Sequence, residues 1–461
     1  MKKPSVLDGQ VVVVGGGVTG MTSALLLQES GADVVLIEKQ PLIGGLARSF
    51  EYDNFIFDVG PHRYHTENPN VVTFLERLMK NQSLWFPRCS EVFFRGKYYS
   101  WPLKPQNLLQ LPLPLALRAS LDLAVNSYRK YDTDSFETYV LRQYGPTLYQ
   151  NFFADYSQKF LGIHPRDTHT DWAKVGINRA IIENDLQMQN LSQLLKTTLL
   201  QSGGDEAQFL YPKKGIHQTW QIAARLFEQK GGRLVMGSGA RLEAGKGRVS
   251  RVVAEATGES FDPSVVIWTA PITLATRQLD LPTPDLRYLG LLLYNVCAEC
   301  DVPRNYQWCY YGAKHLVFNR ISIPKFFSPT TSPPGTTGLC VELTCMEGDE
   351  RWHHAERLTD WVVDDLVRVG MIPNRKAVSD VYVERIPDSY PIYHKEYPEE
   401  LQKARNALST FDNFHLAGRT GMFWYNNMDH SIENAMQLCK RLLRDAGRVE
   451  AEEQLLAAGG L

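Results

Sequence analysis

Glycines near the start of the chain have the spacing of a phosphate-binding turn. Gly15, Gly17 and Gly20 follow the apolar run 11–14 and precede a segment, 21–29, that is rich in Ala and Leu. The first glycine permits a tight turn, the second a close approach of backbone to a pyrophosphate, and the third close packing of helix on strand. The N-terminus of the following helix would offer unpaired N–H groups and a positive dipole end to phosphates. The pattern predicts a dinucleotide site.

Glu38 completes this pattern, because it ends a second apolar run, Val34–Ile37. A carboxylate at that distance from the glycines suits a ribose hydroxyl. Residues 10–38 are therefore expected to form strand, glycine turn, helix and strand, and Lys39 is included in the cofactor-binding set. A glycine turn without a ligand is the simpler alternative, but the flanking strand and helix together with Glu38 favour the nucleotide site.

Two further glycine segments favour FAD over a nicotinamide dinucleotide. Residues 44–48 (GGLAR) supply a second glycine turn and a cation soon after Glu38, and residues 418–421 (GRTG) precede a helix near the C-terminus. An extended FAD needs more pyrophosphate contacts, and a second helix N-terminus would stabilise the negative charge of reduced flavin. The further residues expected to bind FAD are Gly45, Arg48, Gly418, Arg419 and Met428.

The elements that must position these residues predict an α/β protein. Its expected parts are a Rossmann-type FAD-binding domain, a helical insertion and an antiparallel-sheet substrate domain. The boundaries are 1–70 plus 205–286 plus 410–461 for the first, 71–204 for the second and 287–409 for the third. Within the first, segments 231–236 and 248–253 are expected to pair as a hairpin. Residues 328–338, rich in Pro, Thr and Gly, are expected to form an exposed turn region.

Charge and cysteine content exclude several classes of function. The chain has 49 basic and 51 acidic residues and a net charge of -2, which gives no basic surplus for nucleic acid. Its seven cysteines are scattered and odd in number, which favours a reducing, cytoplasmic location. Cys297 and Cys300 have the spacing of half a zinc or redox site, but no second pair completes it, so we expect packing and no metal.

No apolar run is long enough to span a bilayer. The apolar segment 108–125 is interrupted by Pro112, Pro114, Arg118 and Asp122, and we expect a packed helix there. Peripheral attachment to a membrane surface is the alternative. The expected partner is a small molecule, and the oligomeric state stays open.

Three motifs together carry a family resemblance. The segments 44–48 (GGLAR), 60–65 (GPHRYH) and 418–428 (GRTGMFWYNNM) resemble the flavoprotein superfamily of amine oxidases, protoporphyrinogen oxidases and UDP-galactopyranose mutases. The likeness is greatest to the mutases and to protoporphyrinogen-oxidase-like bacterial flavoproteins. It covers almost the whole chain in order, and only the motifs are specific.

The resemblance implies roles for particular residues. His62 and His65 occupy the mutases' Gly-x-His-x-x-His loop beside the flavin, and Tyr156-Ser-Gln-Lys159 resembles a Tyr-Thr-x-Lys segment that lines their substrate site. Arg320 matches an arginine that binds the substrate diphosphate, and Arg419 matches one on the FAD pyrophosphate. The resemblance also implies diphosphate or substrate positions at Arg179, Arg287 and Tyr390.

In the mutases, N5 of reduced flavin attacks the anomeric carbon and expels the nucleotide diphosphate, after which the sugar ring opens and recloses. The protein then supplies orientation and charge stabilisation. Arginines suit this task because their planar fork binds phosphate oxygens bidentately. The resemblance thus implies an FAD-dependent isomerase of a nucleotide sugar.

This sequence departs from the mutases in two places. Leu161 stands where they carry a tryptophan, and Ser389-Tyr390-Pro391 stands where they tend to have two tyrosines before the proline. Both changes weaken UDP-galactose as the substrate and keep the second hypothesis open, an FAD-dependent oxidoreductase acting on an amine, a porphyrinogen or another reduced substrate. A non-enzymatic FAD-binding role has no sequence feature in its favour.

Each candidate also has a structural interpretation. His62 and His65 would pack against FAD, and Arg320 would form an ion pair within its own domain. Trp424 and Tyr425 suggest the aromatic cage of an amine oxidase, but adjacent aromatic residues are more often core packing. Asp429 and His430 lie where a helix cap is needed, so we expect capping and not a catalytic pair.

Overall fold

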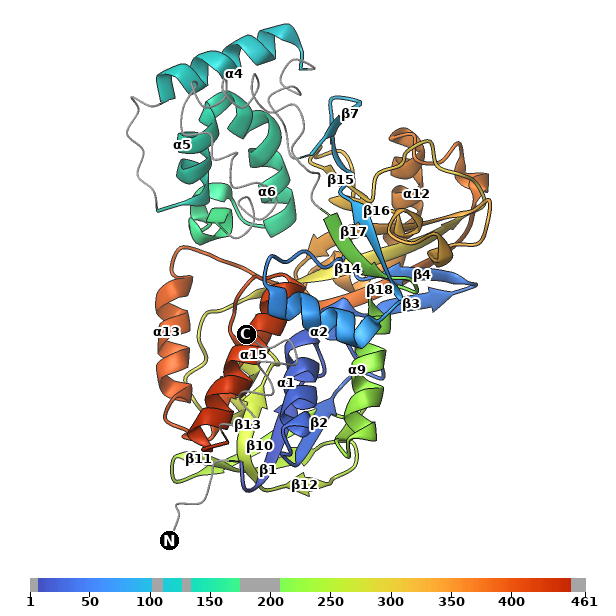
Figure 1. The fold of residues 1–461 in the computed structure, drawn as a ribbon. Coiled ribbons are helices and arrows are strands. Elements are labelled where there is room, and N and C mark those ends of the chain that lie inside the picture. The colour runs from blue at the N-terminus through green and yellow to red at the C-terminus, as the bar shows by residue number, and fades with distance from the viewer. Residues whose placement is uncertain (1–6, 102–110, 127–133, 175–207, 449–461) are drawn as a thin grey trace.

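The computed structural model describes residues 7–101, 111–126, 134–174 and 208–448. Figure 1 shows an α/β part at the bottom, which contains β1, β2 and β13, with a helical part and a second sheet above it. Arg179 lies outside the described residues. The predicted α/β class is confirmed: the chain has a Rossmann-like part and a large antiparallel sheet.

The lower part is built on a parallel sheet with the order β19-β13-β1-β2-β9. Its strands are β1 (Gln10–Val14), β2 (Val34–Glu38), β9 (Arg233–Met236), β13 (Pro263–Trp268) and β19 (Phe414–Leu416). Val11 and Val13 pack with the helices on one face, whereas Val12 and Val14 pack on the other. A continuous β-branched run suits a strand that is buried on both faces.

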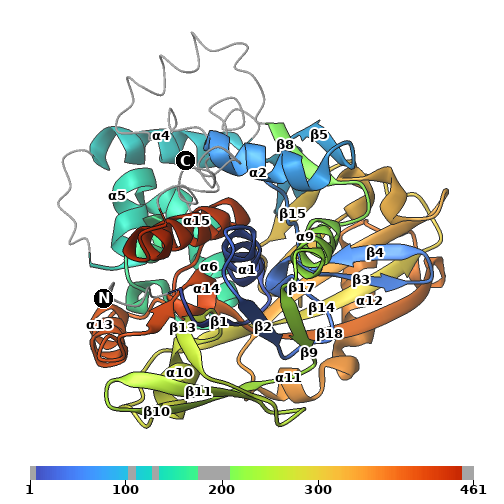
Figure 2. The same ribbon diagram turned by 60° about the horizontal axis from the view of Figure 1, so that its bottom comes forward.

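Each face of the parallel sheet has its own cover. The helices α1 (Val18–Glu29), α9 (His217–Gln229) and α15 (Met428–Asp445) lie on one side, where Figure 2 shows α1 between α9 and α15. The other side carries the sheet of β10 (Ala240–Gly245), β11 (Arg248–Ala254) and β12 (Ser260–Phe261), with α10 (Ile272–Gln278). The glycine turn is thereby fixed at one edge of a rigid layered structure.

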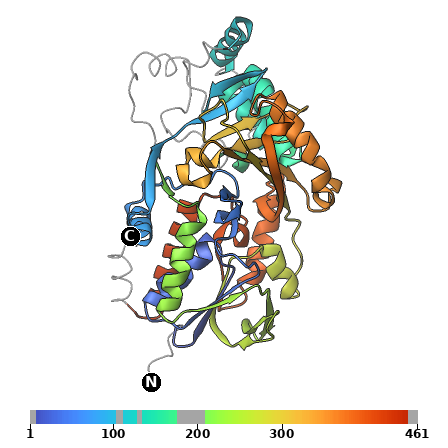
Figure 3. The same ribbon diagram turned by 90° about the vertical axis from the view of Figure 1, so that its right-hand side faces the viewer.

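The second large sheet has the order β18-β14-β17-β16-β15-β6-β7. Its strands are β6 (Ser90–Phe94), β7 (Lys97–Ser100), β14 (Tyr288–Ala298), β15 (Trp308–Tyr311), β16 (Arg320–Ser322), β17 (Thr337–Cys345) and β18 (Val378–Pro391). The short helix α11 (Glu350–His353) follows β17, and α12 (Thr359–Arg368) packs on this sheet through Val362 and Leu366 (Figure 3).

Two small two-stranded sheets and several helices complete the fold. The pairs are β3 (Ser49–Tyr52) with β4 (Phe55–Asp58), and β5 (Ser83–Pro87) with β8 (Gln208–Pro212). The helical part holds α4 (Leu113–Asn126), α5 (Phe136–Leu148) and α6 (Ala154–Leu161). The remaining helices are α2 (Pro69–Met79), α13 (Tyr397–Leu408) and the short α14 (Gly418–Gly421).

The α4 helix is packed on one face only. Leu115 and Ala119 are buried, whereas Leu113, Leu117 and Leu121 are 71%, 57% and 66% exposed. The packed helix expected for this segment is present, with an exposed apolar stripe along its other side. In the described ranges, no helix combines the length and the apolarity needed to cross a membrane.

Two local expectations from the sequence are wrong, and a third is confirmed only in part. Residues 83–100, expected within the helical insertion, form β5, β6 and β7, because alternating residues there find edges of two sheets to pair with. Segment 231–236 is no hairpin partner of 248–253: β9 extends the parallel sheet beside β2, and β11 pairs with β10. The three-part division of the chain otherwise stays a prediction.

The exposed turn region expected at 328–338 is present only in part. Pro329, Thr330, Pro334 and Gly335 are exposed in 3-10 and turn structure. Ser328, Thr331 and Thr337 are buried, and their hydroxyls donate to the carbonyl oxygens of Lys213, Ser328 and Cys300 respectively. These buried hydroxyls satisfy carbonyl groups of the segment itself and of its neighbours.

Candidate functional site

A cavity of about 840 Å³ opens at the carboxyl ends of the parallel strands. Val14, Glu38 and Trp268, which end β1, β2 and β13, line it. Ligands of open α/β sheets bind in the crevice outside these strand ends. The predicted site residues that line this cavity are Gly15, Gly17, Glu38, Lys39, Gly45, Arg48, His62, His65, Arg320, Tyr390, Gly418, Arg419 and Met428.

The glycine turn is as tight as its spacing predicts. Gly15 has φ +99°, and a Cβ atom on Gly20 would lie 1.9 Å from the carbonyl oxygen of Gly15. Gly20 therefore does not line the cavity but lets α1 pack on β1. A Cβ on Gly17 would meet only Gly45 Cα, at 3.8 Å, so the space over this glycine is open. Gly17 is also the N-cap of α1, without a side-chain cap.

Glu38 has a structural role in addition to the expected contact with ribose. Its Oε2 accepts from the backbone N–H of Gly16 at 2.6 Å, and its Oε1 accepts from the N–H of Gln40 at 2.8 Å. The side chain thus ties the glycine turn to the end of β2. Each carboxylate oxygen keeps a further lone pair, so a ribose hydroxyl can still donate to it.

A second helix N-terminus faces the cavity from the C-terminal region. Asn427 is the N-cap of α15 and has no side-chain cap bond, while Asn426, Met428 and Asp429 line the cavity beside it. Asp429 and His430, expected to cap, lie in the first turn instead, with His430 Nδ1 3.2 Å from Asp429 Oδ1. The free N–H groups and dipole of this terminus suit a negatively charged ligand.

Guanidinium groups surround His62. The pKa of His62 is lowered to about 3 by burial and by the positive charges of Arg419, Arg320 and Arg63. Its Nδ1 is buried without a partner in the described structure. The imidazole is therefore neutral at physiological pH, and it lines the cavity near these three guanidinium groups. His65 also lines the cavity, and burial lowers its pKa too.

Arg320 is held by a carboxylate. Its Nε and Nη2 donate to Glu342 Oε1 and Oε2 at 2.6 and 2.5 Å, and Nη2 also lies 3.2 Å from the hydroxyl of Tyr390. Glu342 is only 2% exposed. The ion pair within the sheet, one of the two interpretations of Arg320, is thus present, and the charge of this arginine is compensated although it lines the cavity.

Aromatic rings form the wall beside these charges. Tyr390 and Tyr425 both line the cavity, with ring centroids 5.6 Å apart, and the Arg419 guanidinium lies over them at 4.8 and 4.4 Å. Tyr425 also contacts Trp172 at 5.0 Å. Trp424 is not among the lining residues, and its ring contacts that of His430 at 6.0 Å. Trp424 and Tyr425, although adjacent in the sequence, therefore do not line the cavity together, whereas Tyr390 and Tyr425 do.

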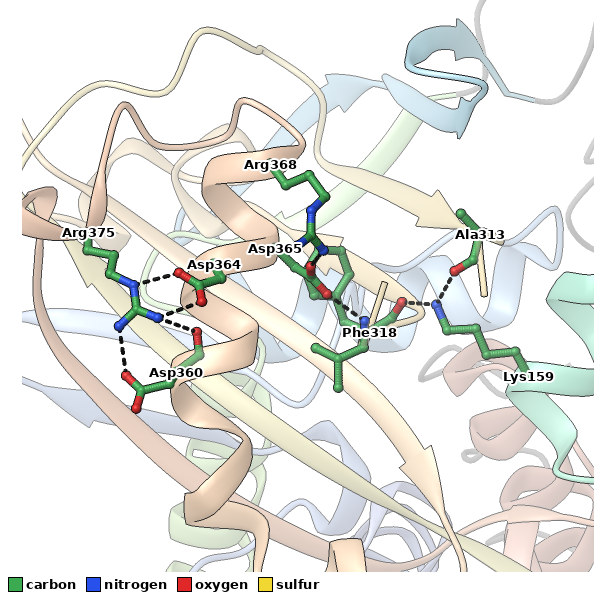
Figure 4. A network of polar contacts seen from close by, with 9 residues as sticks. Lys159, Ala313, Phe318, Asp360, Asp364, Asp365, Arg368 and Arg375 are labelled. Carbon is green, nitrogen blue, oxygen red and sulfur yellow. Dashed lines mark hydrogen bonds and ion pairs between the residues drawn. The ribbon is translucent and has the colours of Figure 1, made fainter. Parts of the chain in front are cut away.

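Lys159, the lysine of the Tyr156-Ser-Gln-Lys159 segment, does not line the cavity but links the helical part to the second sheet. Figure 4 shows Lys159 reaching from α6 to the loop after β15, where Nζ donates to the carbonyl oxygens of Ala313 and Phe318. Nζ also donates to the carbonyl oxygen of Tyr311, the last residue of β15. Burial lowers its pKa to about 7. From the far side of the loop, Asp365 accepts from the N–H of Val317 at 2.7 Å.

Two predicted substrate residues lie away from the cavity lining. Tyr156 is covered by Tyr310 and Phe160, at 5.7 and 5.8 Å between ring centroids. Arg287 is 53% exposed at the surface, where it pairs with Asp285 at 3.1 Å. Leu161, at the position of the mutases' tryptophan, is buried in the core.

Sequence reasoning missed Arg63, Glu342 and Asn426. Arg63 stands between the two histidines of the 60–65 motif, so its place in the motif was the available signal. The sequence around Glu342 and Asn426 gives no such signal. The role of Glu342 depends on the register of β17 against β16, and that of Asn426 depends on the turn before α15.

The residues present fit a flavin dinucleotide. Buried polar atoms at the cavity, namely His62 Nδ1, Arg63 Nε, Arg419 Nε and Asn426 Nδ2, find no hydrogen-bond partner in the described structure. Such groups are rare unless a ligand or water satisfies them. In the same ranges, no cluster of three or more His, Cys, Asp or Glu side chains could hold a metal ion. Cys297 is buried within β14.

Comparisons with known proteins agree with this architecture. A family model described as an NAD(P)-binding Rossmann-like domain matches residues 13–78. The chain is 35% identical over 106 residues to an uncharacterised protein of the nifH2 3' region of Methanothermococcus thermolithotrophicus, covering 23% of this chain and 94% of that protein. It is 27% identical over 164 residues to dTDP-fucopyranose mutase of Escherichia coli, covering 34% of this chain and only 43% of the mutase.

Solved structures match over the full length. Reduced UDP-galactopyranose mutase superposes with a TM-score of 0.81 at 20% identity, over 100% of this chain and 97% of that chain. A protoporphyrinogen oxidase of Exiguobacterium sp. 255-15, assigned as putative, gives 0.74 at 15% identity, over 94% and 98%. The chain therefore belongs to one family with the Methanothermococcus protein and has the fold of the FAD-binding superfamily of amine oxidases, protoporphyrinogen oxidases and UDP-galactopyranose mutases.

Proposed function

We propose that the chain is an FAD-dependent enzyme that isomerises a nucleotide sugar with reduced FAD, as the UDP-galactopyranose mutases do. The observation that carries the proposal is the single cavity in which both glycine turns, Glu38 and the Gly418–Arg419 turn meet histidines and arginines. The mutase fold over the whole chain supports it.

The chain's own residues would divide the cavity between them. Gly17 leaves room for the pyrophosphate at the start of α1, and Glu38 would accept from ribose. Arg48 and Arg419 would contact phosphate oxygens, and the N-terminus of α15 would stabilise the negative charge of reduced flavin. Reduced FAD supplies the nucleophile of this chemistry.

The substrate side is expected to lie where His62, His65, Arg320 and Tyr390 line the cavity. His62 is neutral and has one unpartnered nitrogen, so it would hydrogen-bond a sugar hydroxyl without adding charge. Tyr390 and Tyr425 would shield the reacting centre from water. These side chains orient and stabilise, which matches a reaction without net redox change.

The test is turnover in a defined redox state. The purified protein is assayed for FAD, reduced anaerobically with dithionite, and incubated with UDP-galactose, dTDP-fucose and related nucleotide sugars. We expect a furanose product from the reduced protein alone. Protein that binds no FAD after reconstitution, or reduced holoprotein that rearranges none of these sugars, would disprove the proposal.

A second candidate is an FAD-dependent oxidoreductase. The observation that favours it is the pair Tyr390 and Tyr425 at the cavity wall, together with relatives named L-amino-acid oxidase at 24% identity. Oxygen consumption with an amine or a porphyrinogen, without any sugar rearrangement, would establish this function in place of the first.

A further inference from the structure

Arg63 is a buried cation at the cavity to which the proposed function gives no role. Its guanidinium lies 5.0 and 4.6 Å from the ring centroids of Phe209 and Trp308, which contact each other at 6.3 Å, so the two rings cover adjacent sides of the group. Its Nη1 donates to the carbonyl oxygen of Pro61 at 3.2 Å, and its Nε is buried without a partner. Because Arg63 lines the cavity, the guanidinium can still donate to a further ligand.

No carboxylate of the described residues forms an ion pair with Arg63. Arg320, on the same cavity wall, differs because Glu342 binds two of its nitrogen atoms. Arg419 adjoins the Gly418 turn at the start of α14, where the dinucleotide is expected, whereas Arg63 stacks on Trp308 of β15 in the other sheet. Arg63 therefore has no ion-pair partner on this side of the cavity among the described residues. Burial lowers its pKa, and the charge of Asp429 acts in the opposite direction without an ion pair between them.

A buried charge without a counter-charge is costly, and proteins usually pair it or use it to bind a ligand of opposite charge. The contacts with the two aromatic rings restrict the orientation of the guanidinium, and its planar fork favours a bidentate contact with two oxygens of one anionic group. Neutral His62 next to Arg63, Arg320 and Arg419 adds no negative charge that could replace such a ligand.

We propose that Arg63 is the anchor for an anionic group of the substrate, which under the proposed function is a phosphate of the nucleoside diphosphate. The assignment differs from the one implied by sequence resemblance, which gives the diphosphate to Arg320. The proposal is that the substrate carries an anionic group with oxygen acceptors. It rests on the proposed function only where it identifies that group as a phosphate.

The experiment uses FAD-loaded protein and three variants. Arg63→Gln removes the positive charge and keeps a polar side chain. Arg63→Lys keeps the charge but loses the planar guanidinium that can bind two oxygens. Arg88→Gln is the matched control. Arg88 lies over the same Trp308 ring at 5.4 Å but is not among the cavity-lining residues. UDP and inorganic pyrophosphate are titrated in separate calorimetric runs at two salt concentrations, and FAD content is read from absorbance.

We expect Arg63→Gln to weaken binding of UDP and pyrophosphate about 10- to 100-fold, the loss of one charge-assisted bidentate contact. Arg63→Lys should lose less, Arg88→Gln should bind as the parent does, and FAD content should be equal in all. Unchanged affinities in Arg63→Gln would overturn the proposal, and so would release of FAD from this variant, because Arg63 would then hold the cofactor.

Failure of the proposed function gives a different result. A parent protein without FAD disproves the flavoenzyme itself. If the parent protein holds FAD and binds pyrophosphate through Arg63 but does not bind UDP, the role of Arg63 as an anion anchor is supported and the nucleotide-sugar substrate is disproved. A parent that holds FAD and binds neither anion overturns the anchor.

Discussion

Arg320 and Glu342 face each other across β16 and β17 and form a bidentate ion pair beneath the histidine loop. A Cβ atom on Gly60 would lie 3.0 Å from Glu342 Oε2 and 3.2 Å from Arg320 Nη2, and Gly60 has φ +78°. The loop that carries His62 and His65 thus rests directly on this pair, and only a glycine fits the contact. The ion pair therefore positions the cavity wall as well as the charge within it.

Glu342→Gln is expected to destabilise the protein by about 3–5 kcal/mol, because it leaves Arg320 as a buried charge without its partner. In FAD-loaded protein the same change should tighten UDP binding, since a second guanidinium becomes available. Urea unfolding and calorimetry measure the two effects. Glu356→Gln is the control: it breaks a bidentate pair with Arg385 whose carboxylate is 62% exposed, at a cost below about 1 kcal/mol. Equal losses in both variants would contradict the buried role.

Two glycines of the first turn should respond to alanine in different ways. Gly20→Ala puts a methyl group 1.9 Å from a backbone oxygen and is expected to abolish soluble, folded protein. Gly17→Ala has its nearest neighbour at 3.8 Å, so the apoprotein should fold while FAD affinity falls at least about tenfold. Thermal unfolding with and without added FAD separates the two. Gly245→Ala is the control: its added methyl group meets nothing within 4 Å, so folding and FAD affinity should both stay as in the parent. Full FAD affinity in Gly17→Ala would show that the pyrophosphate does not bind at this glycine.

His62 predicts a specific acid sensitivity. Its pKa is about 3 in the folded protein and 6.5 when unperturbed, so between these values the unfolded chain binds the proton and stability falls as pH falls. From pH 7 to pH 5 this group should cost about 2 kcal/mol, at 1.36 kcal/mol per pKa unit. His62→Gln should lose less stability over that interval, by urea unfolding of FAD-saturated protein, whereas His353→Gln, an exposed control, should follow the parent. Parallel curves for all three proteins would show that His62 titrates normally.

Lys159 should act as a clamp between the helical part and the second sheet. Lys159→Met leaves the carbonyl groups of Tyr311, Ala313 and Phe318 without their donor, at an expected cost of about 2–4 kcal/mol. Backbone amides of residues 311–318, just before Arg320, should then exchange hydrogen faster. Lys174→Met removes a half-exposed pair with Asp171 on the neighbouring segment and should cost less than about 1 kcal/mol. Unchanged exchange in Lys159→Met would mean that the loop is held by other contacts.

Arg287 is expected to be dispensable. Since its pair with Asp285 is exposed, Arg287→Ala should leave both stability and UDP affinity within about twofold of the parent. A tenfold loss of UDP affinity would restore the substrate role that the resemblance implies.

Local motifs were readable from the sequence because their geometry depends on neighbouring residues. The turn at Gly15–Gly20 follows from steric limits within one βαβ unit, and Glu38 stands where that unit ends. The partner of a strand is different: β9 and β11 both have alternating patterns, and only the open edge of β2 decides that β9 joins the parallel sheet. Pairings of this kind depend on distant segments that periodicity does not report.

The same limit applies to charges at the cavity. Arg320 and Arg63 are equivalent as residue types, and their difference comes from Glu342 on a neighbouring strand and from Trp308 and Phe209, more than 140 positions from Arg63. Resemblance assigned the substrate anion to the arginine in the matching position. The three-dimensional surroundings show which of the two guanidinium groups has a carboxylate partner.

The parallel sheet gains its strand β19 from residues 414–416, more than 370 positions after β2. While a ribosome is still synthesising the chain, the glycine turn at residue 15 is exposed long before Gly418, Arg419 and the start of α15 exist. Any dinucleotide bound in this cavity is consequently captured after translation of nearly the whole chain. Fragments produced by premature termination would contain the first glycine turn but would lack the second half of the cavity, and we expect them not to bind the cofactor.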